Sequence, residues 1–481
     1  MLGDVSFKNG SARVRPTPRL TPVLHTAMAM AAAPTRAEPR SVELARIVHL
    51  AAPIALGQVG LVAMGLVDTA ILGRVDAVEL AGASVGRNLG FAAQTLSIGI
   101  AMALEPLASQ AVGAREPDKA WASMVAAMKT LAMVWLPSIV AAYVLTLPLS
   151  WLGLDAAVVA RARVFILAQS PGMLCFALFL SLKTFLQAHG RTRPALVGSG
   201  VANVLNFGLC SVLVRGDDAL AAVNLPALGL PRMGALGAGL ATSFATLVLV
   251  VVTWLAAREF RPAKPVNPVP VRRVLKLGLP SGLHMLAEIG AFTLVSVMAG
   301  RLGTTTVAAN QIALGLASFT FMGALGVSGA TSVRVGHYVG AGESPRRAGL
   351  LGIGLGAALM SAVAVVFALF PRPLIALFTK DPAIVDIGAS LLRVAAIFQL
   401  FDGVQAVGAG ALRGVGDVRY VLYAGICAYW VVGVPLALLF GFTLHGGAVG
   451  MWWGLSASLM TAAVAFLLRF AILSRRAIRR V

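Results

Sequence analysis

Long runs of apolar residues, separated by short polar stretches, occupy most of this chain. A helix of about 20 mainly apolar residues crosses the hydrocarbon core of a membrane. We expect twelve such helices, at residues 49–72, 83–111, 122–147, 160–186, 194–214, 234–257, 275–300, 308–333, 347–370, 388–412, 418–441 and 447–469. The loops between them leave no room for a large soluble domain. The pattern therefore predicts an all-α polytopic membrane protein with twelve transmembrane helices.

Composition agrees with this fold class, since 58% of the 481 residues are hydrophobic and only 12% are charged. The formal net charge of +20 raises the question of nucleic-acid binding. Most of the Lys and Arg residues, however, fall in the N-terminal tail, the even-numbered loops and the C-terminus. Basic loops stay on the cytoplasmic side of a membrane. The charge therefore predicts that both termini are cytoplasmic, and nucleic acid is not expected as a partner.

The first half of the chain matches the second half in order. Four pairs carry the match: Pro53 with Pro280, Arg74 with Arg301, Ala81 with Ala308, and Val112-Gly113-Ala114 with Val339-Gly340-Ala341. Six helices per half is an even number, so both halves enter the membrane in the same direction. The sequence thus predicts two pseudo-symmetric six-helix lobes.

The segments of this organisation follow from the repeat and the predicted helices. We expect a disordered basic tail at 1–45, an N-lobe at 46–257, a cytoplasmic linker at 258–274, a C-lobe at 275–470 and a basic cytoplasmic tail at 471–481. The linker is rich in proline and basic residues, which is typical of a semi-rigid strap. A substrate path is expected between the lobes.

Four carboxylates fall inside the predicted spans: Asp68, Glu105, Glu288 and Asp402. An ionised side chain at membrane depth costs about 2.5–3.5 kcal/mol even on insertion scales, so such residues are usually functional. The repeat does not duplicate them, since the counterpart of Asp68 is Val295. The lobes are therefore expected to share architecture and to differ in chemistry.

The spacing around the C-lobe acids suggests a cation site. His284 lies four residues before Glu288, so both share one helix face. Phe398, Asp402 and Gln405 form another stripe, which could hold an organic cation by charge and by ring contact. Competition between a proton or sodium ion and the substrate for one carboxylate is sufficient for exchange. The alternative interpretation is that these are buried structural acids and that His284 is a packing residue.

Other chemistry finds little support in the sequence. The three cysteines, Cys175, Cys210 and Cys427, lie in predicted helices without metal-ligand or disulfide spacing. Glycine pairs such as Gly352 and Gly354 lack the lysine that follows in phosphate-binding loops. We expect no cofactor, and we do not expect an enzyme.

Four segments carry a resemblance to a known family: PIALGQVGLVAMGLVDTAILGR at 53–74, residues 308–340, residues 399–419, and YWVVGVP at 429–435. They resemble multidrug and toxic-compound extrusion (MATE) transporters, in particular the NorM-like branch. The resemblance implies a V-shaped antiporter that expels organic cations while sodium ions or protons enter. Membrane lipids and small organic cations would be its partners, and we expect a monomer.

The resemblance also implies roles for particular residues. Asp68 and Asn206 would form the N-lobe coupling site, where a transported sodium ion could bind, and Glu288 and Asp402 would serve both coupling and substrate binding. Cys210 stands where the family usually has Asn or Asp. Sodium prefers oxygen ligands to a thiol, so this departure favours protons.

Two questions stay open at the level of sequence. Glu105 near the end of the second helix is interpreted either as a coupling residue or as a residue for gating or for a structural bond to the loop. A lipid-linked precursor flippase of the wider superfamily is the alternative function, although such proteins tend to have basic cavities. The substrate and the choice between proton and sodium are not determined by the sequence.

Overall fold

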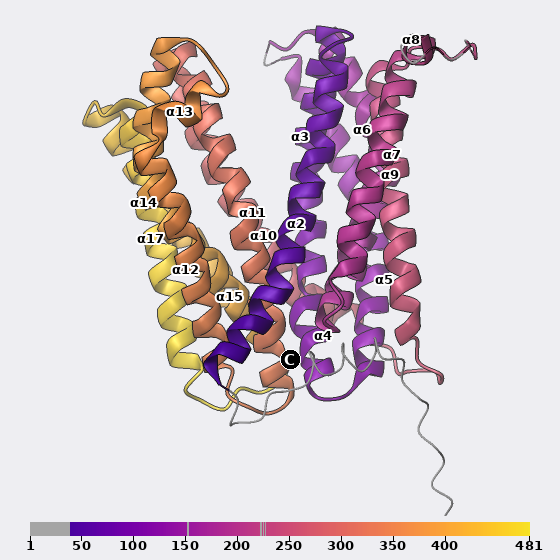
Figure 1. The fold of residues 1–481 in the computed structure, drawn as a ribbon, viewed down its shortest axis with the longest axis vertical. Helices are drawn as coiled ribbons and strands as arrows, with labels where there is room; N and C mark the ends of the chain where they lie inside the picture. Colours follow the sequence, from indigo (N-terminus) through magenta and orange to yellow (C-terminus); the bar gives the residue numbers. More distant parts are fainter. Residues whose placement is uncertain (1–38, 152, 222–223, 225, 227) are drawn as a thin grey trace, which may run out of the picture.

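A computed structural model describes residues 39–151, 153–221, 224, 226 and 228–481 (Figure 1). The helices are α2 Arg40–Leu72, α3 Ala77–Met102, α4 Leu104–Gly113, α5 Pro117–Val144, α6 Ala156–Ala188, α7 Arg193–Arg215, α8 Asp217–Ala221, α9 Gly234–Ala257, α10 Val271–Ala299, α11 Thr304–Gly340, α12 Arg346–Leu369, α13 Pro371–Ala376, α14 Pro382–Val415, α15 Val418–Ile426, α16 Val434–Leu438 and α17 Gly447–Leu473. Short 3-10 segments lie at Leu147–Leu149, Arg258–Phe260 and Gly300–Leu302, and two π-helical segments, η4 Cys427–Gly433 and η5 Leu439–Thr443, adjoin α16.

Twelve helical stretches in the described part of the chain are long and apolar enough to cross a membrane, which confirms the predicted fold class. The first begins at Arg40, directly after Pro39, rather than at residue 49. Pro39 is the N-cap of this helix and has an extended backbone, with φ −62° and ψ 152°. Residues 40–45, which the sequence placed in the tail, are therefore helical, whereas residues 1–38 lie outside the described residues.

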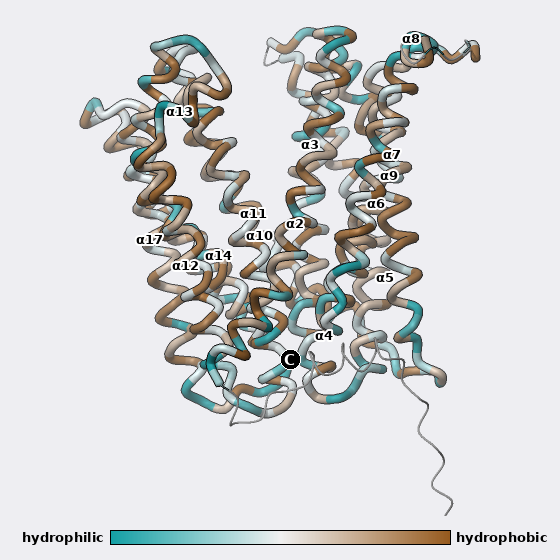
Figure 2. Tube along the Cα trace, viewed as in Figure 1, coloured by the Kyte–Doolittle hydropathy of each residue, from teal (hydrophilic) through white to brown (hydrophobic). Residues whose placement is uncertain are grey.

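The helices form two bundles that meet at one end of the molecule and diverge toward the other (Figure 1). The end where they meet carries the linker and the turns after α4 and α11, and we call it the linker end. The opposite end carries α8 and α13. Apolar residues predominate along the helices, and polar residues gather near both ends (Figure 2).

The first helices of the two lobes cross between the bundles. Helix α2 packs against α11 of the C-lobe and also against α7 of the N-lobe. Helix α10 packs in turn against α3 of the N-lobe and α15 of the C-lobe. Each crossing helix contains an interior proline, Pro53 in α2 and Pro280 in α10. An interior proline removes one backbone hydrogen bond and favours a bend. The repeated prolines thus mark equivalent positions in the two crossings.

A buried ion pair fastens the start of α2 to α11. Arg334 donates from Nε to Glu43 Oε1 at 2.8 Å and from Nη2 to Oε2 at 2.7 Å. Tyr338 donates its hydroxyl to the same carboxylate at 3.2 Å. Both charged side chains are at most 1% exposed. A buried charge is tolerated when it is paired and hydrogen-bonded, so this pair fixes where α2 lies on the C-lobe.

Glycines allow the lobes to touch closely at the linker end. A Cβ atom on Gly340 of α11 would overlap the backbone carbonyl of Gln110 in α4. A Cβ on Gly113 of α4 would overlap the backbone of His337 in α11. Small residues let membrane helices approach one another at backbone distance. The backbones of α4 and α11 therefore pack directly against each other.

The eleventh span departs from regular α-helix. Its π-helical segment η4 precedes α16, in which Pro435 occupies one of the first positions. Proline cannot donate to the preceding turn, and its ring crowds the carbonyl four residues earlier. Such local widening is frequent at functional sites. Here it places Tyr429 in the buried interior of the C-lobe, where it is 1% exposed.

The linker is anchored to the N-lobe next to α9. Phe260 contacts the His189 ring, with centroids 4.3 Å apart, and the Arg191 guanidinium lies 5.8 Å from the Phe260 ring centroid. Arg191 also forms an ion pair with Glu259. The segment then runs as a coil until α10 begins at Val271, so the last four residues of the predicted linker 258–274 are helical.

We expect the Gly340→Ala substitution to lower the thermal stability of the purified protein. The added methyl would force α4 and α11 apart, and overpacking of this kind costs about 1–3 kcal/mol. Gly354→Ala in α12 is the matched control, because a Cβ there would have no neighbour within 4 Å. The midpoint of thermal unfolding in detergent should fall for Gly340→Ala and stay unchanged or rise for the control. Equal midpoints would contradict the close contact.

Candidate functional site

Asp68 lies on α2 at the centre of a polar cluster in the N-lobe. Its side chain is 2% exposed, and Thr242 of α9 donates its hydroxyl to Asp68 Oδ2 at 2.8 Å. Asn206 of α7 reaches the Thr242 oxygen at 3.4 Å. Three helices thus hold the side chains of this cluster. The structure brings Asp68 and Asn206, the two residues of the predicted coupling site, into one cluster through Thr242.

Arg87 of α3 is a fourth member, which the sequence analysis missed. Its Nη2 lies 3.9 Å from Asp68 Oδ2, while Nη1 donates to the Gly65 carbonyl at 2.7 Å and to Thr69 Oγ1 at 2.9 Å. The arginine side chain is 26% exposed. In the sequence, Arg87 is distinguished only as a basic residue near the start of the predicted span 83–111. Asp68 therefore has a cationic neighbour that can still reach solvent.

Two buried oxygen atoms of this cluster have no hydrogen-bond partner among the described residues. They are Asp68 Oδ1 and Asn206 Oδ1. Cys210, which is fully buried, also faces the Asp68 carboxyl group. Buried polar atoms without a partner are rare and need an explanation such as a bound ion, a water or a proton. The cluster can thus accept a proton or a small cation.

The C-lobe cluster joins three helical segments. Gln405 of α14 donates to the Tyr429 hydroxyl at 2.5 Å and lies 3.4 Å from Glu288 Oε1 of α10. Asp402 lies one turn before Gln405 on α14, is 6% exposed, and interacts electrostatically with Glu288. Two carboxyl groups therefore share one site with amide and phenol donors. Tyr429 was not predicted, because nothing in its local spacing linked it to the acids.

His284 and Phe398 lie in apolar surroundings in this conformation. The His284 ring is 5.9 Å from the ring centroids of both Tyr429 and Phe466. Phe398 is 3% exposed and packs on Trp452 at a centroid distance of 5.5 Å. No hydrogen bond between His284 and Glu288 occurs in the described structure. Of the residues predicted to form the cation site, Asp402 and Gln405 thus lie in the polar cluster, whereas the rings of His284 and Phe398 pack in the core.

Glu105 bridges the two lobes at the linker end. Arg413 of α14 donates from Nε to Glu105 Oε2 at 3.1 Å, and from Nη2 to Ser328 Oγ at 3.1 Å. Nearby, Gln110 of α4 donates to the Gly414 carbonyl at 2.9 Å. The Glu105 and Arg413 side chains are 12% and 10% exposed. Glu105 thus forms a structural bond, but to the other lobe rather than to the neighbouring loop, and Arg413 was not predicted as its partner.

Comparison with known proteins identifies the class and then the family. The fold is that of a two-lobed polytopic membrane protein: a crystal structure of the eukaryotic MATE transporter AtDTX14 has a TM-score of 0.80 at 21% identity, covering 91% of this chain and 98% of that one. A crystal structure of the Vibrio cholerae MATE transporter VcmN in the bent form has a TM-score of 0.79 at 19% identity, covering 91% and 98%.

Sequence relatives agree with that class. A "Probable multidrug resistance protein NorM" of Pseudomonas putida is 35% identical over 89% of this chain and 94% of its own length. The "Multidrug resistance protein NorM" of Burkholderia vietnamiensis is 35% identical over 92% and 96%. The MatE family model matches residues 53–212 and 280–439, beginning at the paired prolines of the repeat. The chain belongs to the MATE family of membrane transporters, and it is not an enzyme.

We expect Thr242→Val to destabilise the protein, because it removes the hydroxyl donor of Asp68 and leaves a second carboxylate oxygen unsatisfied. A buried unsatisfied group costs about 1–3 kcal/mol. Thr246→Val, one turn along α9, is the matched control, since the Thr246 hydroxyl donates only to helix carbonyls. The thermal midpoint in detergent should fall more for Thr242→Val. A larger fall for Thr246→Val would contradict the assigned cluster.

Proposed function

We propose that this protein is a multidrug efflux antiporter that exports organic cations in exchange for protons by alternating access. In this proposal it resides in the bacterial inner membrane with both termini in the cytoplasm. The observation that carries the proposal is the C-lobe pair of Glu288 and Asp402. Asp68 of the N-lobe and Asp402 of the C-lobe are buried, and Glu288 is partly buried, in a fold whose bundles meet at the linker end and diverge toward the other.

The C-lobe pair fits a cation exchanger on electrostatic grounds. Gln405 and Tyr429 provide neutral donors, and Arg413, which acts electrostatically on Glu288, is bonded to Glu105. Two carboxylates repel each other at close range, so the pair is most stable when a proton or another cation is present. A proton and an organic cation would then compete for the same carboxyl groups, and this competition couples their movements in opposite directions.

The N-lobe cluster supports protons rather than sodium as the coupling ion. A sodium ion at Asp68 would bring a full positive charge close to Arg87, and the buried thiol of Cys210 supplies no oxygen ligand. A proton on Asp68 would neutralise the carboxylate and release Arg87, whose side chain is partly exposed. The names of the NorM relatives support drug export as the transport activity.

The lipid-linked flippase is the less favoured function. Such a substrate carries a diphosphate and needs basic groups that are free to bind it. Three basic side chains inside the bundles already have partners: Arg413 pairs with Glu105, Lys183 donates to Gln58 at 2.6 Å, and Arg87 faces Asp68. The acids of the C-lobe favour a cationic substrate instead.

We expect a proton gradient, imposed across proteoliposomes, to drive transport of a fluorescent organic cation, and a sodium gradient of the same size to have little effect. Asp68→Asn, Glu288→Gln and Asp402→Asn should each lower the proton-driven rate by at least about tenfold, which corresponds to 1.4 kcal/mol. Each substitution removes the proton-binding group and keeps the side-chain shape.

Asp386→Asn is the control for this experiment, since Asp386 is exposed and pairs with Arg372 on the surface. It should transport like the unmodified protein. Sodium-driven transport would contradict the proton as the coupling ion, but it would agree with the proposed antiport activity. Transport under neither gradient would reject the proposal and favour the flippase. Full activity of all three acid variants would reject the roles proposed for these carboxyl groups.

The junction at the linker end must open during alternating access, so weakening it should change the balance of conformations. Glu105→Gln removes the charge that pairs with Arg413, and a hydrogen bond to a charged group contributes about 2 kcal/mol. We expect faster hydrogen–deuterium exchange in α4 and at the end of α11.

Asp417→Asn is the matched control, because Asp417 accepts from Arg469 at 2.8 Å within the C-lobe at the same end of the molecule. This variant should leave exchange in α4 unchanged. The double variant Glu105→Arg with Arg413→Glu should restore slow exchange. Unchanged exchange in Glu105→Gln would show that the pair does not hold the lobes together.

A further inference from the structure

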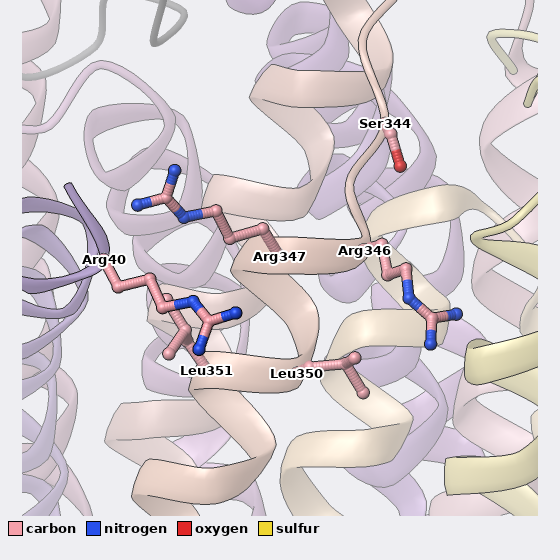
Figure 3. Close-up of a pocket in the computed structure, with 6 residues that line it drawn as sticks. All are labelled: Arg40, Ser344, Arg346, Arg347, Leu350 and Leu351. Atoms are coloured by element: carbon pink, nitrogen blue, oxygen red, sulfur yellow. The ribbon is translucent and has the colours of Figure 1, made fainter. Parts of the chain in front are cut away.

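A pocket with a basic lining opens at the linker end. It has a volume of about 730 Å³ and is lined by Arg40, Ser344, Arg346, Arg347, Leu350 and Leu351. Figure 3 shows Arg40 reaching from α2 toward Arg347 and Leu351 of α12, while Arg346 extends along the other side of the first turn of α12. Three arginines thus contribute to the lining of one pocket, and no acidic side chain is part of the described lining.

Two of these arginines have no acidic partner among the described residues. Arg40 is exposed at the first position of α2. Nε of Arg347 is buried and lacks a hydrogen-bond acceptor in the part of the chain that the structure describes. Arg346 uses one N–H for the Ala471 carbonyl, at 2.9 Å, and retains other donors. Guanidinium groups in this arrangement are the typical binding partners of phosphate oxygens.

The surfaces that lead away from the pocket are apolar. On α2, Leu44 and Val48 follow Arg40 at four-residue intervals and are 37% and 44% exposed. On α12, Leu350 and Leu351 lie one turn after the arginines and are partly exposed. Residues four apart lie on the same helix face. Each helix therefore presents a charge at its end and hydrocarbon along the span.

We propose that this pocket binds the phosphate headgroup of an anionic phospholipid, with the acyl chains lying against the exposed leucine and valine side chains of α2 and α12. Basic pockets between transmembrane helices bind such headgroups at the membrane surface. A free phosphate ion offers the same oxygens to the arginines but leaves the apolar faces uncovered, so the lipid is the better ligand. The bound lipid would join the first helix of the N-lobe to the C-lobe beside the Glu43–Arg334 pair.

The test is phosphatidylglycerol binding to the purified full-length protein, measured by native mass spectrometry in detergent. Removal of each guanidinium should weaken binding roughly fivefold, so Arg40→Gln with Arg347→Gln should weaken it about 25-fold. Arg272→Gln with Arg419→Gln is the matched control: it removes two exposed charges at the same end of the molecule, outside the pocket. Thermal midpoints establish that the variants fold, and Arg40→Gln alone tests the site if the double variant does not.

The expected result is tight binding of phosphatidylglycerol, loss of that binding in the pocket variant, and unchanged binding in the control. Phosphatidylcholine with the same acyl chains should bind weakly. Equal loss in the control variant, or equal binding of phosphatidylcholine, would overturn the proposal. Displacement of the lipid by millimolar inorganic phosphate would assign the pocket to a free anion and would also overturn it. None of these outcomes depends on transport activity.

Discussion

The cost of burying a charge in a membrane protein controls how these two lobes are joined. Charges that leave water must be paired or neutralised, and at the linker end this requirement is met across the molecule. Glu43 of α2 is neutralised by Arg334 of the C-lobe, and Glu105 of α4 by Arg413 of α14. Each pair joins segments from different halves of the sequence. The two bundles therefore hold together at that end and are free to diverge at the other.

Backbone packing and the crossing helices complete this junction. Gly113 and Gly340 allow α4 and α11 to touch without intervening side chains, and α2 and α10 each reach across to the other bundle. The interior prolines Pro53 and Pro280 lie in these crossing helices. The same duplicated sequence unit thus builds both sides of the junction, and a bend in either crossing helix would alter how the lobes meet.

The chemistry, in contrast, differs between the lobes. The N-lobe cluster contains one carboxylate with an arginine beside it, whereas the C-lobe site contains two carboxyl groups with neutral donors. The first arrangement suits release and capture of a proton, and the second suits a larger cation. A phospholipid at Arg40 and Arg347 would add an interaction at the linker end between α2 and α12, and would make the joined state depend on the charge of the surrounding membrane.

The sequence by itself determined the twelve spans, the duplication and the positions of the intramembrane acids, because hydropathy, repeats and the cost of a charge in hydrocarbon are properties of local sequence. Only the tertiary structure decided which groups become neighbours. Arg413 meets Glu105 across 308 residues, Thr242 meets Asp68 across 174, and Tyr429 joins Gln405 through an irregular helix. The start of the first helix was also misplaced, since its early turns are held to α11 by the buried Glu43–Arg334 ion pair rather than by a continuous apolar run. Pairing energy depends on distance in space, and the linear order of residues does not contain that distance.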